Sequence, residues 1–254
     1  YNMLEILFLS MIQGVTEFLP VSSSAHLILF SKYFSFENQS ITLDMSLHIG
    51  SLLAVTIYFR QDLINFFKNK KFFLKIIAAS IPVMLIGYLL IFLDLIEYLR
   101  NVKVIGWMTV IFGFVLYFAD KADINKKIDK DLSLKSAMLI GVFQVLSLIP
   151  GVSRSGITIS AARMLKFKRE DAIKISFLLS IPTLAAVSFF NIFDLYQMNI
   201  LKLSIENFYA VFLSFIFSFI TIKYFLIYIK KFDLKLFVVY RIVLGVIILF
   251  FAYL

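Results

Sequence analysis

Long apolar runs constrain the fold of this sequence more than any other feature. Of the 254 residues, 61% are hydrophobic and 16% are charged. The apolar runs, bounded by charge or proline, lie near 3–19, 25–35, 45–59, 73–93, 104–119, 137–149, 156–165, 173–193, 208–229 and 236–254. A helix needs about 20 apolar residues to cross a bilayer. This pattern predicts an all-α polytopic membrane protein and argues against a soluble domain.

Four of these runs are too short or too broken to cross a bilayer alone, and they form two pairs around Pro20 and Pro150. The starts of the first five runs recur about 130 residues later, which indicates an internal repeat of about 1–119 and about 134–254 within a single membrane domain, 1–254. Repeats with broken helices at matching positions commonly pack as inverted halves. Inversion requires an odd number of crossings per half. We therefore expect an inverted-topology repeat with six full transmembrane helices plus two re-entrant helical hairpins.

Lysine and arginine give the chain a formal net charge of +9, and most of them lie in four short loops between apolar runs. These loops fall near 60–75, 121–135, 163–174 and 223–235. With six crossings all four share one face, and the opposite face receives only Lys32, Arg100, Lys103 and Lys202. The positive-inside rule then makes the basic face cytoplasmic. Because the basic residues flank membrane spans, we expect no nucleic-acid partner. Cysteine is absent, which excludes disulfides and thiolate metal sites.

Two arginines fall outside this distribution. Arg241 lies about one turn inside the last run, where we expect its side chain to snorkel to the interface. Arg154 lies between two serines at the expected tip of the second hairpin, where snorkelling would pull the loop apart. An ionisable side chain at membrane depth is a functional-site hypothesis by default.

The second hairpin has the composition of a phosphate clamp. Gly151 and Gly156 permit a tight turn whose backbone N–H groups, followed by a helix N-terminus, favour anions. The guanidinium of Arg154 matches two phosphate oxygens. Hydroxyl donors accompany it at Ser153, Ser155 and Thr158. A helix N-cap with a charged neighbour is the structural alternative.

The first hairpin offers a cation site. Gln13 and Glu17 are four residues apart, so a helix places both side chains on one face. Two such oxygens suit a divalent cation, Mg²⁺ or Ca²⁺, that also takes phosphate oxygens and water. A polar helix–helix hydrogen bond is the alternative.

Serines and a histidine follow in the same hairpin. Ser22, Ser23 and Ser24 precede His26, which places a hydroxyl and an imidazole in reach of each other and makes His26 a candidate acid or base. His48 has no such company in the sequence, and we expect it to be a structural hydrogen bonder.

These motifs resemble the BacA/UppP family of undecaprenyl-diphosphate phosphatases. The resemblance rests on Gln13–Glu17, Pro20–His26 and Pro150–Thr158, in that order, and on length and hydrophobic profile along essentially the whole chain. It implies a membrane-embedded hydrolase, dependent on a divalent cation, that converts undecaprenyl diphosphate to undecaprenyl phosphate for bacterial envelope synthesis. It also implies a link to bacitracin resistance, a homodimer, and a place in the bacterial inner membrane with the pocket open to the extracytoplasmic side.

The resemblance and the residue chemistry together define the expected site. The catalytic candidates are Glu17, Ser23, His26 and Arg154; the substrate-binding candidates are Ser22, Ser153, Arg154, Ser155 and Thr158; the metal ligands are Gln13 and Glu17. Many family members have Glu where this chain has Gln13, which puts a two-carboxylate metal site in doubt. The nucleophile is either Ser23 activated by His26 or a metal-bound water, and the Ser-x-x-His spacing favours Ser23.

Two other classes of function compete with hydrolysis. Inverted repeats around a midplane site are typical of secondary transporters, and a lipid-phosphate flippase would need the same clamp. Transport, however, needs no general base beside the anion site, and Glu17 with His26 supplies one. A purely structural scaffold leaves the buried arginine unexplained.

Overall fold

The computed structural model describes residues 3–33, 41–68, 70–93, 95–122, 124, 126–197 and 204–254. Within them every regular element is helical, and the one isolated β-bridge pairs Lys126 with Phe167. Six helices of the described chain are long and apolar enough to cross a membrane, which is the number of long spans that the sequence predicts. They are α3 (Ile41–Tyr58), α5 (Lys70–Phe92), α7 (Val102–Asp120), α11 (Arg169–Gln197), α12 (Ile205–Ile229) and α13 (Lys235–Tyr253). The chain is a multi-pass membrane protein.

Four shorter helices correspond to the broken runs of the sequence. They are α1 (Met3–Thr16), α2 (Ser23–Tyr33), α9 (Leu134–Val145) and α10 (Arg154–Met164). Helices α1 and α2 pack together across the turn 17–22, and α9 and α10 pack together across η1 (Leu146–Leu148) and the turn 149–153. The hydropathy pattern missed three small helices, α4 (Arg60–Lys68), α6 (Ile96–Leu99) and α8 (Ile128–Asp131). The end of the run at 25–35, the side chain of Lys32 and Lys202 lie outside the described residues.

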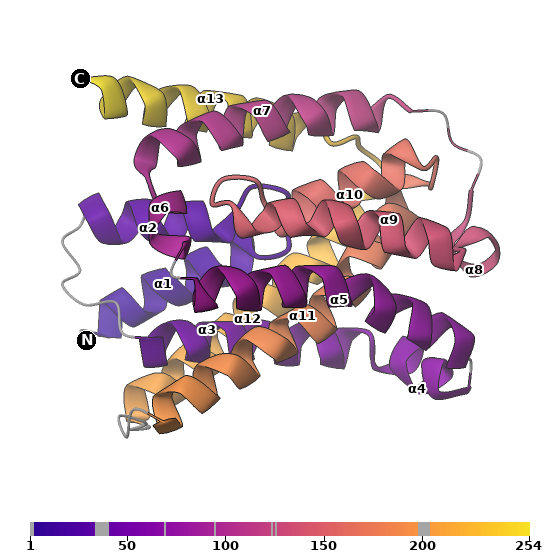
Figure 1. Cartoon of the computed structure of the whole chain (residues 1–254), viewed down its shortest axis with the longest axis horizontal. Coiled ribbons are helices and arrows are strands. Elements are labelled where there is room, and N and C mark those ends of the chain that lie inside the picture. Colours follow the sequence, from indigo (N-terminus) through magenta and orange to yellow (C-terminus); the bar gives the residue numbers. More distant parts are fainter. Residues whose placement is uncertain are drawn as a thin grey trace.

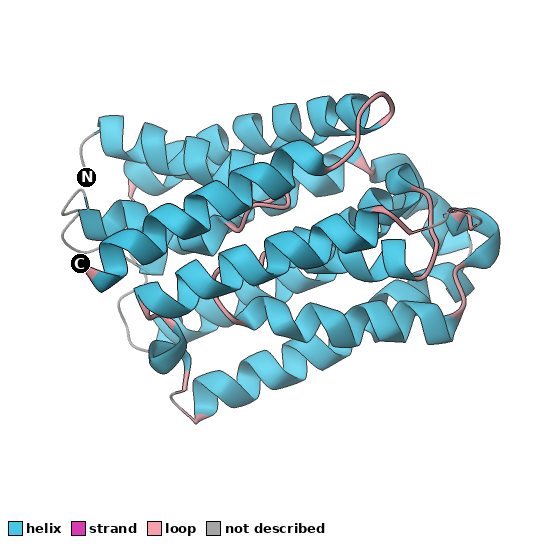
Figure 2. Cartoon of the chain, turned by 90° about the horizontal axis from the view of Figure 1, so that it is seen from above, coloured by secondary structure: helices cyan, strands magenta, loops and turns pink. Residues whose placement is uncertain are grey.

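The long helices run side by side along the long axis of the molecule (Figures 1 and 2). Helix α3 packs against α11 and α12, α5 against α9 and α11, and α7 against α13. The short helices lie among them, since α1 packs on α12 and α10 on α7. Large apolar side chains cover the outward faces, among them Phe92, Phe189, Val243 and Phe250, each more than half exposed. Such faces suit hydrocarbon, where no polar side chain would find a partner.

Small residues bring the short helices against the long ones. A Cβ on Gly14 of α1 would lie 2.5 Å from the Cβ of Phe217 on α12, and a Cβ on Gly141 of α9 would collide with the backbone of Ala79 on α5. Membrane helices pack through such close approaches because lipid supplies no hydrophobic force between them. Glycine at these two positions therefore sets the depth at which α1 and α9 sit in the bundle.

The four basic loops meet at one end of the bundle, in agreement with the charge pattern. Three contacts join them: Lys75 Nζ donates to the carbonyl of Leu132 at 2.7 Å, Lys174 Nζ to Asp62 at 2.6 Å, and the backbone N–H of Leu234 to Asp120 at 3.2 Å. This end carries most of the positive charge of the chain.

The sequence placed Arg163 in one of these loops, and that placement is wrong. Arg163 lies in the last turn of α10 and is 1% exposed. Its guanidinium donates to the carbonyls of Phe167 and Asp120, both at 2.7 Å, and to that of Ala122 at 3.0 Å. It also lies 3.4 Å from the carboxylate of Asp120. Arg163 thus joins α10 to the end of α7, because a buried guanidinium needs this many acceptors.

We expect Gly141→Ala to destabilise the protein by about 1–3 kcal/mol, because the new Cβ must push α9 away from α5. The matched control is Gly87→Ala in α5, whose Cβ would make an ordinary 3.4 Å contact with Leu148. That change should be neutral or stabilising by up to about 1 kcal/mol, since alanine favours helix. Unfolding in detergent, followed by circular dichroism, measures both, and equal effects would refute the packing argument.

Candidate active site

The two interhelical turns share an unusual backbone conformation. Ser22, which precedes α2, has φ 75°, and Ser153, the N-cap of α10, has φ 71°. Non-glycine residues rarely adopt this left-handed region, and strained backbone of this kind clusters at functional sites. Gly151, with φ 97°, completes the second turn, where a Cβ would meet the carbonyl of Ile105 at 2.5 Å. The first side chain after each turn, Ser23 in α2 and Arg154 in α10, contacts Glu17 of the first turn.

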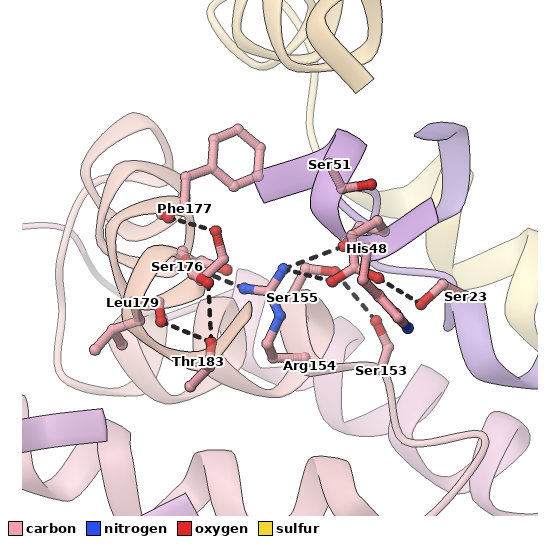
Figure 3. Close-up of polar contacts among 12 residues, drawn as sticks. Ser23, His48, Ser51, Ser153, Arg154, Ser155, Ser176, Phe177, Leu179 and Thr183 are labelled. Carbon is pink, nitrogen blue, oxygen red and sulfur yellow. Dashed lines mark hydrogen bonds and ion pairs between the residues drawn. The ribbon is translucent and has the colours of Figure 1, made fainter. Parts of the chain in front are cut away.

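The turns meet through side chains from both halves of the chain. Arg154 Nη2 lies 3.1 Å from Glu17 Oε1, and the hydroxyl of Ser155 donates to the carbonyl of Leu19 at 2.7 Å. Figure 3 shows Arg154 between Ser176 on one side and Ser23 with His48 on the other. The predicted carboxylate and the predicted guanidinium, 137 residues apart in the chain, are thus direct neighbours.

Arg154 retains a free hydrogen-bond donor. Its Nη1 donates to the carbonyl of Ser176 at 3.2 Å, and its Nη2 also reaches the carbonyl of Glu17 at 3.4 Å. Its Nε is buried and has no partner within the described part of the chain. An unpaired buried N–H on a cation is costly. The guanidinium is therefore prepared for one more acceptor, such as a phosphate oxygen.

Glu17 gathers three donors on its two oxygens. Oε1 accepts from Arg154, and Oε2 accepts from Gln13 Nε2 at 3.1 Å and from the hydroxyl of Ser23 at 2.8 Å. The carboxylate is nearly buried, with 6% of its side chain exposed. Charge-assisted hydrogen bonds of this kind fix the orientation of the carboxylate.

His48 forms a hydrogen bond, as expected, and this bond links it to the same network. Gln13 Nε2 lies 3.0 Å from His48 Nδ1. An amide nitrogen only donates, so Nδ1 accepts and the imidazole proton lies on Nε2. Gln13 thus gives one hydrogen to Glu17 and one to His48. This leaves Gln13 Oε1 buried and without a partner in the described chain.

The donor set fits a cation shared with a substrate. No group of three or more His, Cys, Asp or Glu side chains among the described residues could hold a metal ion by itself. The unpaired Gln13 Oε1 and the remaining lone pair of Glu17 offer two oxygens. Mg²⁺ commonly binds through one or two protein oxygens together with phosphates and water. Gln13 and Glu17 are therefore the residues that would hold such an ion.

The Ser-x-x-His spacing predicts a hydrogen bond between Ser23 and His26, but the structure does not contain this bond. Ser23 donates to Glu17 instead. His26 Nδ1 lies 2.7 Å from the carbonyl of Ser22, which can only accept, so Nδ1 carries a proton. His26 Nε2 lies 2.6 Å from the hydroxyl of Tyr240 on α13. The nearest base to Ser23 is thus the carboxylate of Glu17, and His26 forms a separate pair with Tyr240.

The other predicted hydroxyls bond within the protein. Ser22 Oγ lies 3.4 Å from Ser24 Oγ. Ser153 Oγ accepts from the backbone N–H of Gly156 at 3.1 Å and lies 3.1 Å from Ser155 Oγ. Thr158 lies 2.7 Å from Ser176 Oγ and donates to the carbonyl of Arg154 at 2.8 Å. Ser22, Ser153 and Ser155 thus shape the turns, and Thr158 fixes α10 to α11.

The sequence predicts a snorkelling side chain for Arg241, and this prediction is wrong. Arg241 is fully buried and donates to backbone carbonyls of both turns. Sequence reasoning also missed Tyr240 and Ser176. A signal existed for Arg241, because it lies within an apolar run, where an ionisable residue usually faces the protein interior. Nothing comparable marks Ser176 or Tyr240.

Comparison with known proteins identifies the family of this chain. The family described as bacitracin resistance protein BacA matches residues 6–247. The chain belongs to the BacA family. It is 46% identical to the undecaprenyl-diphosphatase of Pelagibacter ubique, over 99% of this chain and 98% of that protein. It is also 42% identical to the undecaprenyl-diphosphatase of Saccharophagus degradans, over 96% of both chains.

We expect Glu17 and Arg154 to show strong coupling in a double-mutant cycle. Removing one partner leaves the other charge buried, whereas removing both restores part of the loss. Glu17→Gln, Arg154→Gln and the double variant should give a coupling energy of about 1–3 kcal/mol for unfolding in detergent. Lys235 and Asp233, whose side chains are 69% and 33% exposed, form the control pair and should couple by less than about 1 kcal/mol. Equal coupling in both pairs would contradict the buried ion pair.

Proposed function

We propose that this BacA-family protein hydrolyses undecaprenyl diphosphate to undecaprenyl phosphate and inorganic phosphate, which returns the lipid carrier to bacterial cell-wall synthesis. The observation that carries the proposal is the contact of Glu17 with Arg154 beside an unpaired donor and an unpaired acceptor. A terminal phosphate needs a cationic donor, and its transfer needs a base and a charge-neutralising partner. The names of the two relatives support the same reaction.

The proposed topology is a single membrane domain built as an inverted repeat with two re-entrant hairpins. Two observations support it. Met3 and Leu134 begin α1 and α9, Ser23 and Arg154 begin α2 and α10, and both pairs of starts are 131 positions apart. In Figure 1 the α1/α2 pair and the α9/α10 pair reach the middle of the bundle from opposite ends.

Packing between helices supports the same repeat. If α1, α3 and α5 correspond to α9, α11 and α12, the contact of α1 with α12 has its counterpart in that of α9 with α5. The contact of α3 with α12 likewise matches that of α11 with α5, and all four contacts are present. Ser22 and Ser153, whose left-handed backbones precede α2 and α10, are counterparts at the same spacing.

The orientation follows from charge. We place the end with the basic loops in the cytoplasm of a bacterial inner membrane. The α1/α2 hairpin then enters from the opposite side, and the pocket opens toward that extracytoplasmic side. The prenyl tail leaves sideways into membrane lipid. A homodimer is part of the proposal.

In the mechanism the protein binds the terminal phosphate at Arg154, whose Nε has no partner among the described residues. Ser23 Oγ attacks the terminal phosphorus, and its proton passes to Glu17 Oε2, 2.8 Å away. The bond from phosphorus to the bridging oxygen breaks, which releases undecaprenyl phosphate, and water then hydrolyses the phosphoserine. His26, with the hydroxyl of Tyr240 on its Nε2, is the candidate to exchange the proton of the leaving oxygen. A divalent cation held by Gln13 and Glu17 would neutralise phosphate charge when bound.

A lipid-phosphate transporter is the second candidate function, because repeated halves around a central anion site are also the design of carriers. The hydrogen bond from Ser23 to Glu17 favours hydrolysis over transport. A carrier has no use for a hydroxyl beside a base.

We expect the purified protein to release inorganic phosphate from undecaprenyl diphosphate. Arg154→Ala and Glu17→Gln should each lower the rate by about 10²-fold or more, because each removes a charge that acts on the phosphate. EDTA should abolish release, and added Mg²⁺ or Ca²⁺ should restore it. Leu146→Ala, at an exposed position of η1, is the control and should keep the wild-type rate. Transport of the lipid without phosphate release would support the carrier instead.

A second prediction concerns the nucleophile. Ser23→Ala should abolish turnover, by at least about 10³-fold, whereas Ser24→Ala, at an exposed neighbour, should change it little. Acid-quenched single turnovers with substrate labelled at the terminal phosphate should trap label on the wild-type protein and none on Ser23→Ala. If Ser23→Ala keeps more than about a tenth of the rate and wild-type protein stays unlabelled, water is the attacking group.

A further inference from the structure

Arg241 joins three separate segments through one guanidinium. From α13 its Nε donates to the carbonyl of Thr109 on α7 at 3.3 Å, and its Nη1 to that of Pro20 at 3.2 Å. Its Nη2 donates to the carbonyls of Gly151 and Val152 at 2.8 and 3.1 Å. Pro20 belongs to the first turn, and Gly151 and Val152 to the second. A single side chain thus holds both turns of the site.

The carbonyls of Pro20, Gly151 and Val152 have few other hydrogen-bond donors within reach. They lie just before Ser22 and Ser153, where the positive φ turns the chain and interrupts regular backbone pairing. A buried carbonyl without a donor costs as much as a lost hydrogen bond. Of the side chains, only arginine presents five N–H donors in one rigid fork, whereas lysine offers three on a flexible stem.

The surroundings of Arg241 are shaped to admit this fork. A Cβ on Gly156 would lie 3.2 Å from Nη1 of Arg241, and a Cβ on Gly113 would lie 3.3 Å from its Cβ. A Cβ on Gly245 of α13 would lie 2.5 Å from Val110 on α7. Close contact of α7 with α13 therefore fixes the height at which the guanidinium meets the turns.

Arg241 differs from the other fully buried arginine of the described chain. Arg163 faces the carboxylate of Asp120, while the hydrogen bonds of Arg241 all go to backbone carbonyls. A buried cation without an acidic partner is expensive for stability alone. The free-energy cost of burying Arg241 is explained if the geometry of the two turns depends on this side chain.

We propose that Arg241 is a positioning residue of the active site: it sets the two turns against each other and thereby fixes the contact of Arg154 with Glu17. The kinetic test of this proposal rests on the proposed function, because it measures phosphate release. Its structural test is independent of any activity.

The absence of cysteine allows a direct measurement of turn position. Met11 on α1 and Val142 on α9 are both exposed. The substitutions Met11→Cys and Val142→Cys allow attachment of spin labels for distance measurements between the two hairpins. We expect a narrow distance distribution in the parent protein, and a broadened or shifted one in Arg241→Lys and Arg241→Met. Arg163→Lys is the matched control, because it weakens a buried arginine far from the turns, and should leave the distribution narrow.

The kinetic arm separates positioning from general loss of stability. Per folded protein, Arg241→Lys should lower kcat for phosphate release by about 10²-fold, the effect expected when catalytic groups are displaced by about an ångström. Arg163→Lys should match the parent once folded fractions are equalised. If Arg241→Met does not fold, Arg241→Lys alone decides. An unchanged distance distribution in Arg241→Lys overturns the proposal, while a broadened distribution in a protein whose parent releases no phosphate refutes only the proposed function.

Discussion

One ion pair between the two halves of the chain underlies the arrangement of this site. Glu17 and Arg154 are both nearly enclosed, and either charge alone in such surroundings would cost several kcal/mol. The turn that carries one must therefore meet the turn that carries the other. Ser155 reinforces this contact by donating to the first turn, and Arg241 on α13 fixes it by donating to three carbonyls of the two turns. Polar groups at membrane depth have only each other as partners. Their need for hydrogen bonds and opposite charges therefore fixes how the two turns pack.

The lipid bilayer also explains why so much of the fold could be predicted. A bilayer demands helices of about 20 apolar residues, so hydropathy alone found the six spans and set apart the four short helices. It missed α4, α6 and α8, because these are short and their formation depends on tertiary contacts. The placement of Arg163 failed for a related reason. Its nearness to other basic residues in sequence said nothing about Asp120, which lies on a different helix.

The site was predictable in its members more than in its pairings. Glu17, Gln13 and Arg154 were identified because such residues are rare in apolar runs. The partner of Ser23 was not, because spacing considers only neighbours on one helix. The left-handed Ser22 turns the start of α2 back toward Glu17, where the hydroxyl gains a charge-assisted bond that a neutral imidazole would not match. His48 and Tyr240 lie on helices distant in sequence from the turns, and no local sequence pattern predicts their contacts.

Gln13 shows how the site balances charge before a substrate arrives. A carboxylate at this position would repel Glu17 across one helical turn. The amide instead donates to Glu17 and to His48, which leaves Glu17 and Arg154 to cancel each other. The positive charge of Arg241 then has no acidic counterpart among its own contacts. A site with this surplus of positive charge favours a multiply charged anion.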